Sequence, residues 1–87
     1  MDLSELYKKV ASKIKFLRKQ QNLTQEKLAE LSGISVDYLG KIEANIDKPG
    51  FKGLHKIITG LNISYSEFYK DIWFTTTFPV NLCDKIQ

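Results

Sequence analysis

Apolar residues recur at steps of three and four through the first part of the chain, and lysines occupy several of the positions between them. The apolar positions are Leu3, Leu6, Val10, Ile14 and Leu17. This spacing lines one side of an α-helix and predicts a helix over residues 3–21. Asp2 suits its N-cap, with Glu5 three residues later, and Asn22 suits the turn that follows.

Two shorter helices are predicted next, with a glycine between them. Thr24 is a good N-cap for a helix over residues 25–31, and Ser35 is a good N-cap for a helix over residues 36–44. Gly33 permits a sharp, left-handed reversal between the two. A capped helix, a tight turn and a second capped helix form a helix-turn-helix pattern.

The rest of the chain divides into a helical part and a part of different character. Turn-forming residues predict a loop over 45–50, followed by helices over residues 51–61 and 65–72. From residue 73 the chain is rich in β-branched and aromatic residues, which favours an extended, strand-like segment. We therefore expect an all-α, five-helix domain over 1–72 and a C-terminal extended tail over 73–87.

Composition limits the classes of protein that the chain can represent. With 87 residues, 43% hydrophobic and 26% charged, it has the size and balance of one small globular domain. The net charge is only +3, but seven cations against one glutamate fall within residues 8–27. This basic segment is either the solvated side of an amphipathic helix or a surface that binds a polyanion.

Catalysis and metal binding find little support among the residue types. Cys83 is the only cysteine and His55 the only histidine, so neither a disulfide within the chain nor a zinc cluster is expected. No phosphate-binding glycine loop and no cluster of carboxylates stands out. The sequence has no signal-peptide pattern and no long apolar run. We expect a cytoplasmic protein that is not an enzyme and needs no metal or other cofactor.

Six short motifs in order resemble the Cro and phage-repressor-like (XRE-type) helix-turn-helix domains, across about residues 10–69. They are Ile14 to Arg18, Leu23 to Ala29, Gly33 to Ser35, the Ile42-Glu43 pair, Pro49, and the Ile63-Ser64 pair. The resemblance implies a lambda-repressor-like fold whose second short helix enters the major groove of double-stranded DNA.

The resemblance also implies a set of DNA-contacting residues. They are Thr24, Gln25, Ser35, Val36, Asp37, Tyr38, Lys41, Lys48 and Lys52. Gln25 corresponds to a position that contacts the DNA backbone and supports the recognition helix, although it is also an ordinary helix-start residue. Asp37 suits a cytosine amino group and Val36 a thymine methyl. Tyr38 either donates to a phosphate or buries its ring in the core.

Other matched positions concern stability and the strength of phosphate binding. Arg18 and Glu43 correspond to an ion pair that braces the first helix against the third. Ala44 and Asn45 depart from the basic residue and the glycine that the family often has there, so the loop beside the third helix is less cationic than usual. We therefore expect modest non-specific affinity for DNA.

The C-terminal part carries many large apolar groups. They are Tyr65, Phe68, Tyr69, Ile72, Trp73, Phe74 and Phe78. We expect them to form a homodimer surface, because one recognition helix covers only a few base pairs. The alternative is that the tail folds back on its own domain. The sequence thus favours a homodimeric regulator of a palindromic operator, with an antitoxin-like, protein-binding module as the alternative.

Overall fold

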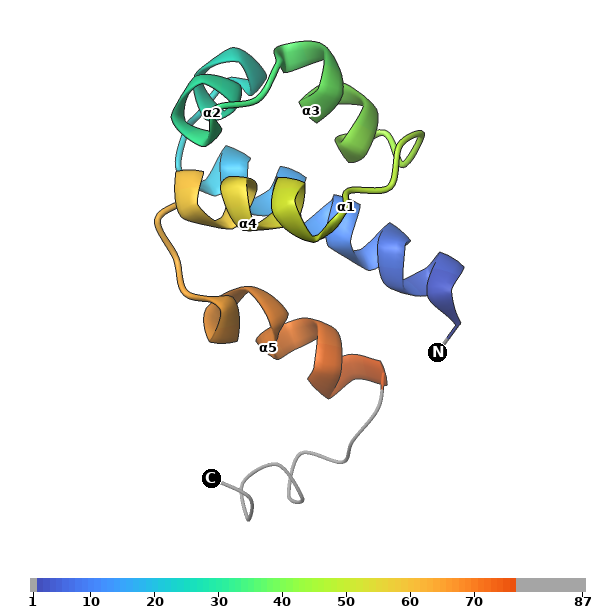
Figure 1. Cartoon of the computed structure of the whole chain (residues 1–87). Helices are drawn as coiled ribbons and strands as arrows, with labels where there is room; N and C mark the ends of the chain where they lie inside the picture. The colour runs from blue at the N-terminus through green and yellow to red at the C-terminus, as the bar shows by residue number, and fades with distance from the viewer. Residues whose placement is uncertain (1, 77–87) are drawn as a thin grey trace.

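The computed structural model describes the backbone of residues 2–76 and the side chains of residues 2–70 and 72. Five helices account for most of that range. They are α1 (Leu3–Gln20), α2 (Gln25–Ser32), α3 (Val36–Glu43), α4 (Phe51–Gly60) and α5 (Tyr65–Thr76). In Figure 1, α2 and α3 lie at one end of the molecule, α1 and α4 cross the middle, and α5 lies at the opposite end. The expected five-helix fold is confirmed.

Short polar side chains begin four of the helices, and three of these caps, Asp2, Thr24 and Ser35, were predicted from the sequence. Each accepts a hydrogen bond from the backbone amide three residues later, at 2.9 to 3.1 Å. The pairs are Asp2 with Glu5, Thr24 with Lys27, Ser35 with Tyr38, and Ser64 with Glu67. Each bond satisfies a helix-end amide that has no partner within its own helix. The caps explain why these helix starts could be located from sequence.

The turns rely on residues that tolerate left-handed backbone. Asn22, Asn45 and Asn62 follow α1, α3 and α4 with φ close to 60°, and Gly33 follows α2 with φ of 71°. Asparagine and glycine adopt this conformation more readily than other residues. The chain therefore reverses soon after each of these helices, which allows short helices to surround one core.

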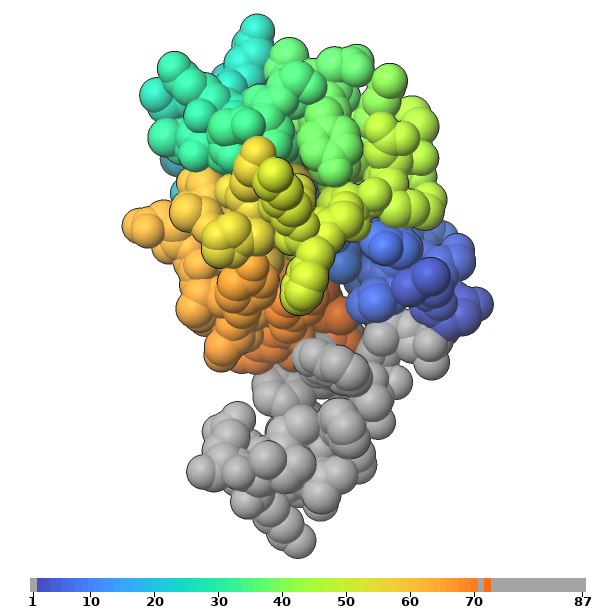
Figure 2. Space-filling model, viewed as in Figure 1, coloured from blue at the N-terminus to red at the C-terminus, as the bar shows by residue number. Residues whose placement is uncertain are grey.

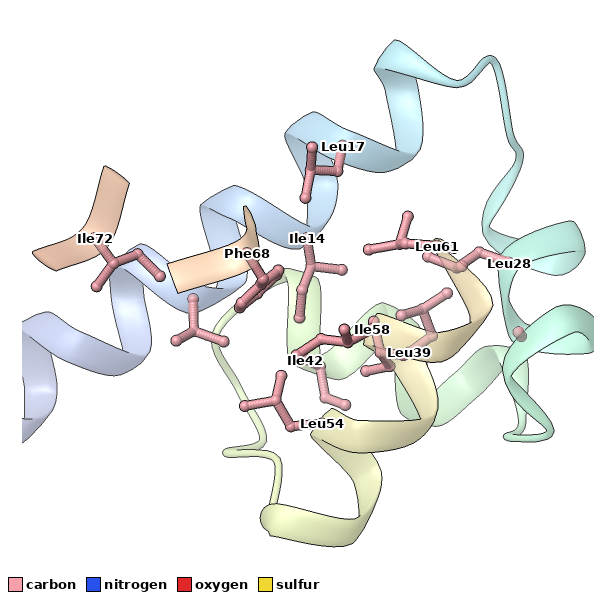
Figure 3. Close-up of a cluster of buried hydrophobic side chains, with 13 residues drawn as sticks. Ile14, Leu17, Leu28, Leu39, Ile42, Leu54, Ile58, Leu61, Phe68 and Ile72 are labelled. Carbon is pink, nitrogen blue, oxygen red and sulfur yellow. The ribbon is translucent and has the colours of Figure 1, made fainter. Parts of the chain in front are cut away.

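Buried side chains from all five helices meet in that core (Figure 3). Ile14 of α1, Leu28 of α2, Leu39 and Ile42 of α3, and Ile57 of α4 are completely inaccessible to solvent. Burial of this apolar surface supplies most of the driving force for folding. Because α2, α3 and α4 contribute to the same core, the orientation of α3 is tied to the rest of the domain.

The prediction for the C-terminal region needs two corrections. Phe68 and Ile72 were expected at a dimer surface, but they are 0% and 4% exposed and belong to the core. They lie four residues apart and therefore share the side of α5 that faces α1. Figure 3 shows Phe68 beside Ile14.

The second correction concerns the extended tail. α5 continues to Thr76, so residues 73–76 are helical and not strand-like. Tertiary context commonly overrides a local preference of this kind. The side chains of Trp73 and Phe74, and all of Phe78, lie outside the described residues. No helix in the described range combines the length and apolar character needed to cross a membrane.

Candidate nucleic-acid interface

The helix-turn-helix unit consists of α2, the turn at Gly33 and α3. Gly33 has left-handed backbone, and the amide of Ile34 donates to the carbonyl of Ala29 at 3.0 Å, which closes the turn. Leu28 and Ala29 of α2 are buried against the core. The first turn of α3 therefore begins at a fixed position relative to α2.

A buried ion pair holds the other end of α3. The guanidinium of Arg18 donates from Nε to Glu43 Oε2 at 2.8 Å and from Nη2 to Glu43 Oε1 at 3.1 Å. Arg18 Nη1 also donates to the carbonyl of Leu23 at 2.8 Å. The two charged side chains are only 10% and 2% exposed. Arg18 and Glu43, expected as a bracing pair, thus connect α1, the α1–α2 turn and the C-terminal end of α3.

Gln25 joins the same network from the start of α2. Its Nε2 donates to Glu43 Oε1 at 3.1 Å, and its side-chain oxygen lies beside Gly40 of α3. The half-buried side chain is therefore a support for α3, beyond the ordinary role of a helix-start residue. One carboxylate, on Glu43, accepts from both Arg18 and Gln25, so three helices depend on a single acceptor group.

The opposite side of α3 is open to solvent. Ser35, Val36, Asp37 and Lys41 are all exposed, and Val36 retains 43% of its accessible surface. Asp37 Oδ2 and Lys41 Nζ form an ion pair one turn apart, at 3.3 Å. An exposed pair of this kind contributes little stability and separates readily. These four side chains, all expected to contact DNA, are therefore open to solvent, and Thr24 is also exposed at the start of α2.

Tyr38 lies differently from its neighbours. The ring is half-buried and packs against the core, and the hydroxyl lies against Gly53 of α4. A methyl group added at Gly53 would lie 2.8 Å from that oxygen. The structure thus favours the core position that the sequence left open for the ring, with α4 as its neighbour.

Two lysines flank the start of α4. Lys48 and Lys52 are exposed, and Lys48 Nζ donates to the carbonyl of Asn45 at 3.3 Å. Gly50, the N-cap of α4, has no side chain to bond the first amides of the helix. Unsatisfied amides at a helix start, together with lysine charge, attract phosphate. The site therefore has two parts, the exposed surface of α3 and the start of α4.

Two exposed apolar residues beside this site did not emerge from the sequence. Ile46 in the α3–α4 loop is 68% exposed, and Phe51 at the start of α4 is 87% exposed. For Ile46, the available signal was an apolar residue within a run of turn-forming residues. Phe51 looked like an ordinary core residue of a helix, because periodicity does not show which way a helix start turns.

Comparison with known proteins assigns the chain to a family. The model of the Helix-turn-helix family matches residues 14–68, which span α2, α3 and α4 entirely. The chain belongs to the Helix-turn-helix family. This assignment confirms the resemblance that the sequence motifs indicated.

Named regulators and solved structures of Helix-turn-helix proteins are similar to this chain. The transcriptional regulator SutR of Escherichia coli is 38% identical over 66 residues, covering 76% of this chain and 37% of SutR. PuuR of Escherichia coli is 34% identical over 55 residues, covering 63% of this chain and 30% of PuuR. The chain thus spans about a third of the length of these curated relatives.

A solved Helix-turn-helix structure matches over most of its length. It is the restriction-modification controller protein C.Esp1396I, with a TM-score of 0.74, 33% identity, and coverage of 80% of this chain and 87% of that one. The same protein as a tetramer with its natural 35 base-pair operator gives a TM-score of 0.76 at 32% identity, covering 83% and 92%.

Among the side chains described for our protein, no three His, Cys, Asp or Glu gather as metal ligands.

Proposed function

We propose that this protein is a sequence-specific transcriptional regulator that binds double-stranded DNA in the cytoplasm and inserts α3 into the major groove. The observation that carries the proposal is the contrast between the two sides of α3. One side is fixed by Arg18, Glu43 and Gln25, while the other presents exposed polar and small apolar groups. A reading helix needs this combination, because base contacts require a fixed angle of entry.

The exposed residues suit distinct roles at the DNA. Val36 and Asp37, near the start of α3, suit base edges, with Val36 against a thymine methyl and Asp37 accepting from a cytosine amino group. We assign Lys41, Lys48 and Lys52 to phosphates, because lysine charge contributes affinity without reading sequence. Thr24, Gln25 and Ser35 suit backbone contacts at the two helix starts. Named regulators and an operator-bound controller protein among the relatives support this proposal.

We also propose that the protein acts as a homodimer through an aromatic surface formed by Phe51, Tyr65 and Tyr69. The rings of Tyr65 and Tyr69 stack with centroids 6.3 Å apart, and Phe51 and Tyr65 line the same hollow on the surface. Phe51 also lines a second hollow with Tyr69 and Leu3. Flat, exposed aromatic groups are typical of protein interfaces. Tyr65 and Tyr69 also belonged to the dimer surface predicted from the sequence. Phe51 is new, and the buried Phe68 and Ile72 are left out.

The position of the aromatic surface fits a DNA-bound dimer. Phe51 follows Gly50 directly and adjoins Lys52, so the proposed dimer surface meets the start of α4. We expect two copies joined there to present both α3 helices to one side of a duplex. Such a dimer reads two half-sites about 34 Å apart, one helical turn of DNA. The tetrameric operator complex of C.Esp1396I shows that a related protein assembles on DNA.

Selection from a library of random duplexes tests the DNA proposal. We expect enrichment of a palindromic sequence, and binding to it that weakens steeply with added salt. Lys41→Ala should weaken binding and lower the slope of log affinity against log salt by about one. Lys15→Ala, which removes an equal charge from α1, is the matched control and should leave that slope nearly unchanged. Enrichment of no sequence by the unmodified protein contradicts the proposal.

Sedimentation tests the dimer surface. We expect the full chain to sediment as a dimer at micromolar concentration and Tyr65→Asp to sediment as a monomer, because a buried unpaired carboxylate opposes association. Ser66→Asp places the same charge on a neighbouring exposed residue of α5 and should remain dimeric. A dimer that survives both Tyr65→Asp and Phe51→Asp lies on another surface.

A further inference from the structure

A groove on the outer side of α1 has no role in the function proposed above. It measures about 570 Å³, and α5 contributes Ile72 to its wall. The α1 residues that matter chemically are Glu5, Lys8, Lys9, Lys13 and Phe16. Lys8 and Lys9 give the groove cationic groups, and the exposed ring of Phe16 gives it a surface suited to an apolar group.

The groove lies apart from the candidate DNA interface. Among the described residues, its lining comes from α1 and α5 and none of it from α2, α3 or α4. On α1, Arg18 meets α3 through Glu43, whereas Lys9 and Phe16 stand about 180° and 200° around the helix from Arg18 at 100° per residue. In Figure 2, the N-terminal half of α1, in blue, lies low on the right, whereas α2 and α3, in green, lie at the top.

Phe16 is an exposed apolar residue that lies outside the core and outside the proposed DNA and dimer surfaces. Its side chain is 59% exposed in the middle of α1, although Ile14 and Leu17 beside it are buried. Lys9 and Phe16 are seven residues apart and therefore lie on the same side of the helix, two turns from each other. An exposed aromatic ring next to lysines is the arrangement expected of a binding surface with an apolar centre and a charged rim.

We infer that this groove binds an acidic amphipathic segment of a partner protein, with carboxylates paired to Lys8 and Lys9 and an apolar side chain seated against Phe16. Charge complementarity selects the occupant, because lysines at the rim attract carboxylates and repel basic segments. A duplex fits less well, since its phosphates need only charge and its paired, stacked bases present no open face to the Phe16 ring. The regulator would then hold DNA at α3 and a protein at α1.

Fluorescence anisotropy with a defined peptide tests the inference on the full chain. The probe is a fluorescein-labelled amphipathic peptide with glutamates along one side of a helix and leucine and phenylalanine along the other. We expect saturable binding in the micromolar range that weakens with added salt. Lys9→Glu and Phe16→Ala should each weaken it by about tenfold, because one reverses a rim charge and the other removes the apolar contact.

Matched variants separate the groove from general attraction to a basic protein. Lys15→Glu makes the same charge change on α1 outside the groove and should keep its affinity for the peptide within about twofold. Lys8→Glu, at an exposed position, repeats the reversal within the groove in case Lys9→Glu disturbs folding. Far-ultraviolet circular dichroism and binding of a DNA duplex show that each variant is folded.

Three results overturn the inference. The first is no binding of the peptide. The second is equal binding of a control peptide in which lysines replace the glutamates. Equal loss of affinity in Lys9→Glu and Lys15→Glu has the same meaning, because the attraction is then not specific to the groove. The third is displacement of the peptide by DNA together with weaker DNA binding by Lys9→Glu than by Lys15→Glu, which assigns the groove to nucleic acid. None of these results tests α3, so the proposed regulator function is tested separately, by the selection of DNA duplexes.

Discussion

The two ends of the molecule are held by different forces. At the α2–α3 end, a buried network of directional polar contacts sets the geometry, in which Glu43 accepts from Arg18 and Gln25. At the α5 end, Phe68 and Ile72 are buried in the core while Tyr65 and Tyr69 stack on the outside. Directional contacts fix an angle, whereas apolar burial depends mainly on the area removed from water.

This difference matches the two proposed tasks. A helix that reads bases must enter the groove at a nearly constant angle. The carboxylate of Glu43, on the side of α3 away from the proposed DNA surface, fixes that angle. A surface that pairs with a second copy needs a broad apolar area and tolerates small shifts. The polar end should therefore respond sharply to the loss of a single partner, and the apolar end should respond in proportion to the surface that is lost.

The largest expected effect tests the polar end. Glu43→Ala leaves the Arg18 guanidinium, with only 10% of its side chain exposed, without a carboxylate. Breaking a buried pair in this way costs about 3 to 5 kcal/mol in the free energy of unfolding. Urea denaturation measures it, with Glu67→Ala, at an exposed site, as the control. The double change Arg18→Met with Glu43→Leu should recover much of the loss.

A loss below about 1 kcal/mol for Glu43→Ala, the size expected of an exposed pair, contradicts the role given to the network. It would mean that Arg18 reaches water when Glu43 is removed. The orientation of α3 would then depend on its apolar contacts, Leu39 and Ile42, as that of α5 depends on Phe68 and Ile72.

The α2–α3 end could be predicted from sequence because its signals are local. Thr24, Ser35 and Gly33 act within three residues of their own positions, and their caps and left-handed turn lie where the pattern placed them. The helix boundaries there agree to within one residue. Arg18 and Glu43 are far apart in sequence, and the family resemblance, not the local pattern, connected them.

The α5 end could not be predicted as well, because the same residue types serve both core and surface. Phe68 and Ile72 form one row along the helix, and Tyr65 and Tyr69 form another, both at steps of four. Which row is buried depends on how α5 rotates against α1, and that contact is tertiary. The exposure of Phe51 was missed for the same reason.

The next largest effect concerns the packing of α2 on α4. A Cβ at Gly60 would collide with Ser32 Oγ and lie 3.1 Å from the Ser32 backbone. Gly60→Ala should therefore destabilise the protein by about 1 to 3 kcal/mol, despite the better helix propensity of alanine. At Gly53 the obstacle is the Tyr38 hydroxyl, at the end of a side chain that can turn. Gly53→Ala should change stability by less than about 1 kcal/mol, and thermal unfolding of both variants checks the difference.

Removal of equivalent caps compares the two ends directly. Thr24 and Ser64 each accept an amide hydrogen bond at 3.0 Å. Thr24→Ala and Ser64→Ala should each cost about 1 kcal/mol of stability. Thr24→Ala should also weaken DNA binding, because α2 supports α3 through Gln25, while Ser64→Ala should not. Duplex titrations at a temperature where both variants are folded test this, and equal DNA affinities contradict the assignment of α2.

The smallest effect is expected at high pH on the aromatic surface. Burial, with a lesser contribution from Tyr65, raises the pKa of Tyr69 above its ordinary 10.0. Above that pH the unfolded chain loses a proton that the folded protein retains. Stability is therefore fully present below pH 10.0 and falls as the pH rises toward the higher pKa of the folded state.

Urea unfolding on either side of pH 10.0 should show a smaller fall in Tyr69→Phe than in the unmodified protein. The comparison between the two proteins removes the contribution of every group that they share. Tyr65→Phe, which removes the neighbouring charge but leaves Tyr69 buried, should reduce the fall only slightly. An equal fall in the unmodified protein and in Tyr69→Phe places the alkaline loss elsewhere. It would also indicate that Tyr69 is as open to water as Tyr65, so that α5 offers a flatter and more fully exposed aromatic surface to a second copy.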